Sequence, residues 1–214
     1  MSTRSDLTTY VALLRGINVG GNAMVSMKEL KACFEGLGFQ DVVTYINSGN
    51  IIFKDKRTDI PKLVQLIETG IKAHRRMDIR VIVRTKSEMS ALCKKIPADW
   101  VTDGDMRTDV MFLWDAVDTP EAIATLRADP GVDRLVHVKG ALIWNVTRKD
   151  YPKSKVPKMI GGTFYKNMTA RNANTTRKLL ELMSKEPTTT SEPRPRRTGT
   201  NRPTKTPKGK KRSR

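Results

Sequence analysis

The sequence predicts an α+β protein with two tandem ferredoxin-like halves, each of the order β-α-β-β-α-β, followed by a C-terminal helix and a disordered basic tail. Three observations support this prediction. Short apolar runs alternate with segments of helical period in the first part of the chain. A similar order of patterns returns from residue 110 onward. From Pro187 to the C-terminus, no apolar side chain larger than proline occurs, so this segment cannot bury enough surface to fold.

The first strand is expected at residues 11–14, a short apolar run that ends at the glycine-rich loop RGINVGG. A helix then begins at Ser26, because SMKE (26–29) matches the S/T-x-x-E capping box. The apolar residues that follow recur at helical spacing. Gly38 supplies a C-terminal stop for this helix.

A hairpin is expected next, because two β-rich runs at 42–46 and 51–53 flank the turn-forming residues NSGN (47–50). Thr58 or Asp59 caps a second helix, which has Pro61 in its first turn. Residues 79–83 form the fourth strand, and residues 87–95 form a connecting helix. We therefore expect the first half to span residues 1–97.

The second half repeats this order of patterns, although not the residues themselves. A strand at 110–114 precedes a helix that runs from Thr119 to Leu126. The segment RLVHVKGALIWNV is a hairpin that turns at Lys139-Gly140. A polar linker over 147–158 leads to a further helix, a short strand near 167–170 and a last helix over 174–183. The second half thus spans residues 98–184, and the tail spans residues 185–214.

The net charge of +18 is unevenly distributed over the 214 residues. Residues 148–178 hold nine lysines and arginines against one aspartate, and the tail holds eleven against two glutamates. This distribution favours anionic partners. One expected partner is nucleic acid, bound without sequence preference between Arg194 and Arg214; another is an anionic small molecule.

Cysteine content and hydropathy bear on the compartment. The two cysteines, Cys33 and Cys93, cannot form a disulfide framework for a domain of this size, which indicates a reducing compartment. No run approaches the roughly 18–20 apolar residues that a membrane span requires. We expect a soluble cytoplasmic protein that does not contact a membrane.

Four motifs carry a family resemblance: YVALLRGINVGG, TYINSGNIIF, DVMFLWD and TARNANTTRKLLEL occur in this order. Together they resemble the bacterial family called domain of unknown function 1697, over roughly residues 8 to 183. The resemblance implies a double ferredoxin-like α+β architecture. It implies no reaction, because the family is named for lacking one.

The glycine loop is the first candidate site. Its glycines have the spacing of a Walker A motif, but Asn22-Ala23 replaces the lysine and the hydroxyl, so Walker-type phosphate binding is excluded. Glycine backbone N–H groups near a helix N-terminus can still approach an anion, and an arginine is a bidentate donor. The alternative is a structural connection between strand and helix. The candidate contacts are Arg15, Asn18, Gly20 and Gly21.

Two further segments are candidates for the same site. Ser48 and Asn50 lie in the first hairpin turn, where Asn and Gly also have a purely structural explanation. Arg171 and Asn172 precede the last helix, which Asn172 or Asn174 is expected to cap. Capping does not explain Arg171. The site hypothesis requires Arg15, Ser48 and Arg171 to converge on one concave surface.

Catalytic and metal chemistry have little support in the sequence. Neither His74 nor His137 has a second ligand at metal spacing, so no metal is expected and no cofactor is identified. The leading hypothesis is therefore a protein that binds a nucleotide, a phosphate metabolite or nucleic acid near RGINVGG. One alternative is a small enzyme of unknown reaction that acts on an anionic substrate, but no base or nucleophile is evident. The other is a non-specific nucleic-acid tether formed by the tail.

Overall fold

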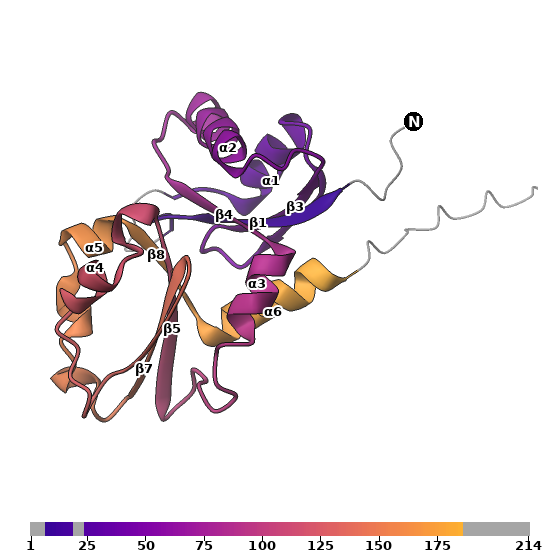
Figure 1. The fold of residues 1–214 in the computed structure, drawn as a ribbon. Coiled ribbons are helices and arrows are strands. Elements are labelled where there is room, and N and C mark those ends of the chain that lie inside the picture. The colour runs from indigo at the N-terminus through magenta and orange to yellow at the C-terminus, as the bar shows by residue number, and fades with distance from the viewer. Residues whose placement is uncertain (1–6, 19–23, 186–214) are drawn as a thin grey trace, which may run out of the picture.

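The computed structural model describes residues 7–18 and 24–185 (Figure 1). It is an α+β structure with two four-stranded antiparallel sheets, as the sequence predicts at this level. Gly20 and Gly21 of the predicted site, and the predicted tail apart from Lys185, lie outside the described residues.

The first sheet has the strand order β2-β3-β1-β4. Its strands are β1 (Thr8–Leu14), β2 (Gln40–Tyr45), β3 (Asn50–Asp55) and β4 (Val81–Thr85). Helices α1 (Met27–Gly36) and α2 (Ile60–Arg75) cover one face of this sheet, where they enclose a core that includes Phe34, Phe53 and Ile67 (Figure 1).

The second sheet has the equivalent order β6-β7-β5-β8. Its strands are β5 (Met106–Leu113), β6 (Arg134–Val138), β7 (Ala141–Thr147) and β8 (Met168–Asn172). The short helices α4 (Pro120–Ala124) and α5 (Thr163–Lys166) lie on its outer side with three 3₁₀ turns, η2 (Asp115–Val117), η3 (Tyr151–Lys153) and η4 (Val156–Met159).

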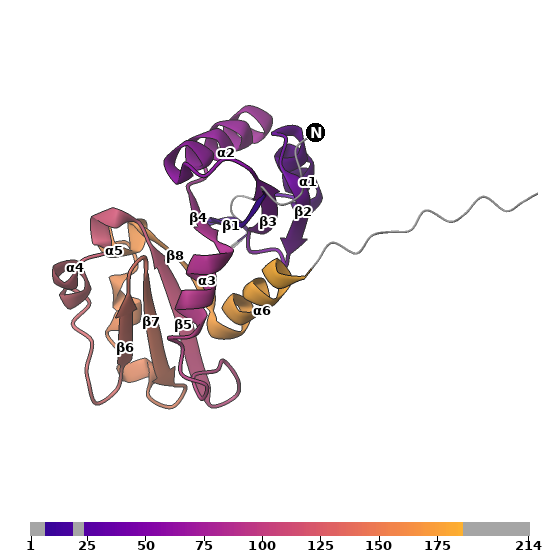
Figure 2. The ribbon, with the colours of Figure 1, turned by 45° about the vertical axis from the view of Figure 1, so that its right-hand side comes forward.

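A shared core joins the two sheets. Helices α3 (Lys86–Cys93) and α6 (Ala173–Ser184) pack against each other and lie between the sheets (Figure 2). Val11 and Ile52 of the first sheet belong to the same buried cluster as Phe112 and Ile143 of the second and Leu179 of α6. Alternation along a strand explains this arrangement, because Tyr10, Ala12 and Leu14 of β1 point to the outer core instead.

The predicted helix starts and turns are confirmed in most cases. Ser26 caps α1 by accepting a hydrogen bond from the Glu29 backbone N–H, and Asp59 caps α2. Both hairpins turn where the sequence predicts. The helix expected to reach Leu126 ends at Ala124 instead, and the Thr125 hydroxyl donates a hydrogen bond to the Ala122 carbonyl there.

None of the helices in the described part of the chain combines the length and the apolar character needed to cross a bilayer.

Candidate functional site

The two sheets meet through a pair of arginines at equivalent positions. Arg84 is the fourth residue of β4 and Arg171 is the fourth residue of β8. In each case the next residue caps the following helix: Thr85 caps α3 and Asn172 caps α6. The two halves therefore present the same side chain at the same point of their last strands.

Each arginine reaches across to the other half. Nη2 of Arg171 donates to the carbonyl of Leu14 at 2.9 Å and to that of Gly49 at 3.2 Å. Nη2 of Arg84 donates to the carbonyls of Leu113 at 3.2 Å and Gly140 at 3.1 Å.

These four acceptors are equivalent in pairs. Leu14 and Leu113 end the first strands of their sheets, and Gly49 and Gly140 are the hairpin glycines. The junction is thus held by two reciprocal arginine clamps.

Arg171 has no N–H group left for a ligand. Its Nε donates to Asn50 Oδ1, and its Nη1 donates to Thr169 Oγ1 at 3.0 Å and to the Ala170 carbonyl at 2.7 Å. Together with the two bonds from Nη2, these contacts use all five donors of the guanidinium. Arg171 therefore contributes structure and positive charge rather than a direct contact.

A cavity of about 380 Å³ opens beside Arg171, and we call it the Arg171 pocket. It is formed by the loop after β1, the first hairpin turn and the segment from α5 to β8. The predicted residues Arg15, Ser48 and Arg171 do converge there. The lining residues are Leu14, Arg15, Gly16, Ile17, Ser48, Tyr165, Met168, Thr169, Ala170 and Arg171.

Arg15 keeps donors available in this pocket. Its Nε donates to the Met168 carbonyl at 3.1 Å and its Nη2 to the Tyr165 carbonyl at 3.2 Å, while its guanidinium lies over the Tyr165 ring. Within the described part of the chain, its three other N–H hydrogens have no acceptor. Arg15 can therefore donate to a bound anion without giving up these bonds.

The remaining predicted residues of the described chain are engaged in hydrogen bonds within the protein. Asn50 is fully buried behind the pocket, where its Nδ2 donates to the Tyr45 carbonyl and to Ser48 Oγ. Asn18 adopts a left-handed backbone and bonds both the N–H and the carbonyl of Val25, so it closes the loop. Asn172 Oδ1 accepts from the Thr175 backbone N–H as the cap of α6.

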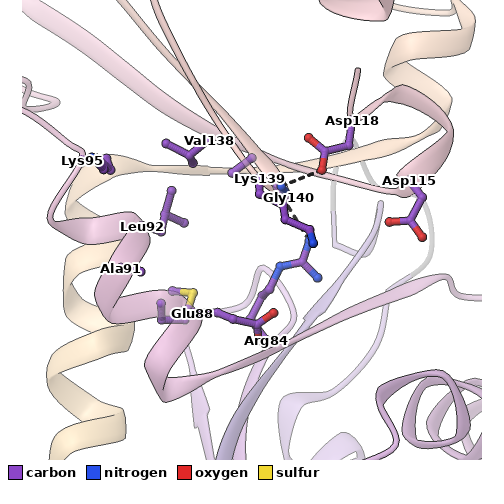
Figure 3. Close-up of a pocket in the computed structure, with 12 residues that line it drawn as sticks. Arg84, Glu88, Ala91, Leu92, Lys95, Asp115, Asp118, Val138, Lys139 and Gly140 are labelled. Carbon is purple, nitrogen blue, oxygen red and sulfur yellow. Dashed lines mark hydrogen bonds between the residues drawn. The ribbon is translucent and has the colours of Figure 1, made fainter. Parts of the chain in front are cut away.

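A second cavity, of about 420 Å³, lies beside Arg84, and we call it the Arg84 pocket (Figure 3). Buried Met89, Leu92 and Ala141 contribute apolar surface to it, and charged groups of both signs line it. Asp118 fixes the hairpin by accepting from the Gly140 backbone N–H at 2.8 Å. The carboxylates that line the Arg84 pocket are Glu88, Asp115 and Asp118. The described lining of the Arg171 pocket contains no carboxylate.

The two arginines consequently have different electrostatic surroundings. Burial lowers the pKa of Arg84, while Glu88, Asp115 and Asp118 act to raise it. Burial lowers the pKa of Arg171 to about 10, with no opposing effect from a carboxylate. At neutral pH Arg171 is therefore a buried cation, and none of the described residues forms a salt bridge with it.

Sequence reasoning missed two parts of the junction. Arg84 occupies the same position near the end of its strand as Arg171 does. The T-x-x-E motif at 85–88 marks the start of the next helix, so the sequence did contain a signal for Arg84. Tyr165 lies in the four-residue helix α5, which is too short to show a periodic pattern, and only the fold brings it to Arg15. In the described residues, no group of three or more His, Cys, Asp or Glu side chains is placed to hold a metal ion.

Comparison with known proteins places this architecture in a family. The family described as "Protein of unknown function (DUF1697)" matches residues 7–144, and the chain belongs to it. Among solved structures, the chain is similar to the conserved bacterial protein SP0830 from Streptococcus pneumoniae. The two are 30% identical, with a TM-score of 0.72, over 83% of this chain and 99% of that one. No curated protein matches the chain.

Proposed function

We propose that the protein binds a small anion, such as a nucleotide phosphate or a phosphorylated metabolite, in the Arg171 pocket. One observation carries the proposal: two arginines that are far apart in the sequence line one cavity to which no described residue contributes a carboxylate. An anion in this cavity would gain charge-assisted hydrogen bonds from Arg15 and would compensate the buried charge of Arg171.

The Arg84 pocket serves as an internal comparison. The equivalent arginine there has three carboxylates nearby in the protein itself. A buried cation without a partner is costly, and a protein compensates it with a counter-charge or with hydrogen bonds. At Arg171 neutral oxygens supply the hydrogen bonds, and the counter-charge is left to a ligand.

The pocket favours binding over catalysis. At about 380 Å³ it lies within the range of small-ligand sites. Its described lining offers the Ser48 hydroxyl, the Thr169 hydroxyl and the Tyr165 phenol, but no carboxylate, imidazole or thiol that would serve as a general base.

We also infer that each half is a ferredoxin-like unit, with the halves dividing near residues 97 and 98. The support is the order of each sheet, in which the first and third strands are central, together with the β-α-β-β-α-β succession of elements. A cytoplasmic location and nucleic-acid contacts from residues 194–214 remain predictions from the sequence.

The proposal is tested by calorimetry with phosphate, pyrophosphate and nucleoside diphosphates. Arg15→Gln should abolish binding of the ligand that wild type takes up, and should leave the melting temperature without ligand within about 2 °C, because Arg15 is partly exposed. Arg134→Gln is the matched control: it removes the same charge from β6, which does not line the pocket. No binding by wild type, or equal loss in both variants, would contradict the proposal.

A further inference from the structure

The chain between β7 and β8 presents one sign of charge to the solvent. Six basic side chains in residues 148–166 are exposed, and Asp150 is the only acidic residue in this segment. We call these six the basic face: Arg148, Lys149, Lys153, Lys155, Lys158 and Lys166.

Packing of the same segment explains why the basic side chains face outward. Tyr151, Val156, Met159 and Phe164 join the core on the outer side of the second sheet. Figure 1 shows α4 and α5 on the side of this sheet opposite to α3 and α6. The segment therefore lies over the sheet with its apolar side chains inward and its basic side chains outward.

Three exposed lysines on helices α1 and α2 of the first half, in contrast, have an acidic partner. Lys31 pairs with Glu35, Lys62 with Asp59, and Lys72 with Asp78. Other exposed lysines, such as Lys28 and Lys86, form no ion pair within the described part of the chain, so the distinguishing feature of residues 148–166 is the clustering of basic residues beside a single acidic one.

On the basic face the pairing is largely missing. Lys153 pairs with Asp150, and Arg148 donates to the Asp103 carbonyl. Among the described residues, Lys149, Lys155, Lys158 and Lys166 form no ion pair. Four like charges thus remain uncompensated on one short segment.

We propose that the basic face binds the phosphodiester backbone of nucleic acid without sequence preference. Uncompensated cations spread along a segment match a linear array of phosphates, and their binding releases condensed counterions. Backbone contacts of this kind position a strand but do not read its bases. The proposal does not depend on the Arg171 pocket, although Tyr165, next to Lys166, lines that pocket.

The test uses the full chain, so that the tail is present in every variant. A triple variant of the basic face, with Lys149, Lys155 and Lys158 each changed to Gln, is compared with a control triple variant. The control changes Lys31, Lys62 and Lys72 to Gln, which removes the same charge from exposed, paired positions. Affinity for a labelled single-stranded DNA of about 20 nucleotides is measured by fluorescence anisotropy over a salt series.

The basic-face variant should bind about tenfold more weakly at low salt, and its slope of log K against log salt should be shallower by about 2, or roughly 0.7 for each lost phosphate contact. The control variant should retain the wild-type slope. An unchanged slope in the basic-face variant, or equal changes in both variants, would overturn the proposal.

Protection from lysine-modifying reagents gives an independent readout. Bound DNA should shield Lys155 and Lys158 and leave Lys62 reactive; the reverse pattern would also overturn the proposal. Arg15→Gln should retain the DNA slope. This variant therefore separates failure of the basic face from failure of the Arg171 pocket.

Discussion

At the scale of single residues, Arg171 is the side chain with the clearest role. It is 7% exposed and gives all five of its N–H groups to neutral oxygens on both halves of the protein. The forked shape of the guanidinium matters, because the single nitrogen Nη2 donates both to the Leu14 carbonyl at the end of β1 and to the Gly49 carbonyl in the hairpin turn. A lysine keeps the charge but not this geometry.

Arg171→Met should therefore lower the free energy of unfolding by about 3–5 kcal/mol, since several buried acceptors lose their donor at once. Arg171→Lys should recover little of this loss. Urea denaturation followed by circular dichroism measures both variants. A methionine variant as stable as wild type would show that the clamp does not hold the junction.

Asp55 gives a pH dependence with a definite sign. Burial acts to raise the pKa of its carboxyl, but hydrogen bonds and attraction from Arg57 outweigh burial and hold that pKa below its usual 3.8. Because the folded pKa is depressed, this pair stabilises the fold above the unfolded pKa, and the stabilisation is lost as pH falls through the folded value.

Asp55→Asn should accordingly flatten the fall in unfolding free energy below about pH 4. Denaturation midpoints over an acid pH series, for wild type and variant, provide the measurement. Parallel curves for the two proteins would mean that another carboxyl dominates acid sensitivity.

At the scale of elements, the first hairpin turn joins the sheet to the pocket. Gly49 has φ +72°, and an added Cβ would lie 2.7 Å from Leu14 Cβ and 2.8 Å from Ile17 Cδ1. Its carbonyl accepts from both the Leu14 N–H and Arg171. A side chain here would push the turn away from the strand end that Arg171 clamps.

Gly16 supplies a matched control for this turn. It has φ +69°, but nothing lies within 4 Å of an added Cβ. Gly16→Ala should cost only the backbone strain, about 1 kcal/mol. Gly49→Ala should cost about 2–3 kcal/mol more because it also creates an overlap with packed side chains. Equal losses in denaturation experiments would contradict this account.

Sequence patterns predicted these elements where the signal is local. The NSGN turn at 47–50, the caps at Ser26 and Asp59 and the succession of strands depend on neighbouring residues, and the structure confirms them. The predicted end of α4 was wrong because the backbone N–H groups of Thr125 and Leu126 donate to the carbonyls three residues back, at Ala122 and Ile123, which ends the α-helical pattern. Element boundaries depend on such small competing contacts, which periodicity does not register.

At the scale of the whole molecule, the two halves share a core and exchange equivalent contacts. Such contacts could not be predicted from sequence, because Arg171 meets Leu14 and Asn50 across more than a hundred residues. Convergence of Arg15, Ser48 and Arg171 was expected and is observed. The capping role of Asn172 was also expected and is confirmed, whereas the role of Asn18 emerges only from its hydrogen bonds.

Charge is arranged at this scale as well. The Arg84 pocket contains carboxylates and three lysines on α1 and α2 are paired, whereas the Arg171 pocket and the basic face leave positive charge uncompensated among the described residues. Both uncompensated regions include residues of the segment between β7 and β8. This part of the molecule is where we expect anions to bind.

The most direct test of the central claim is an NMR titration of the full chain with inorganic phosphate and a nucleoside diphosphate. We predict saturable shifts of the Arg15 Nε–H signal and of the backbone amides of Gly16, Ile17 and Ser48, with Lys139 and Gly140 in the Arg84 pocket unmoved. Shifts confined to the Arg84 pocket, or none at the Arg171 pocket with any of these anions, would contradict the account.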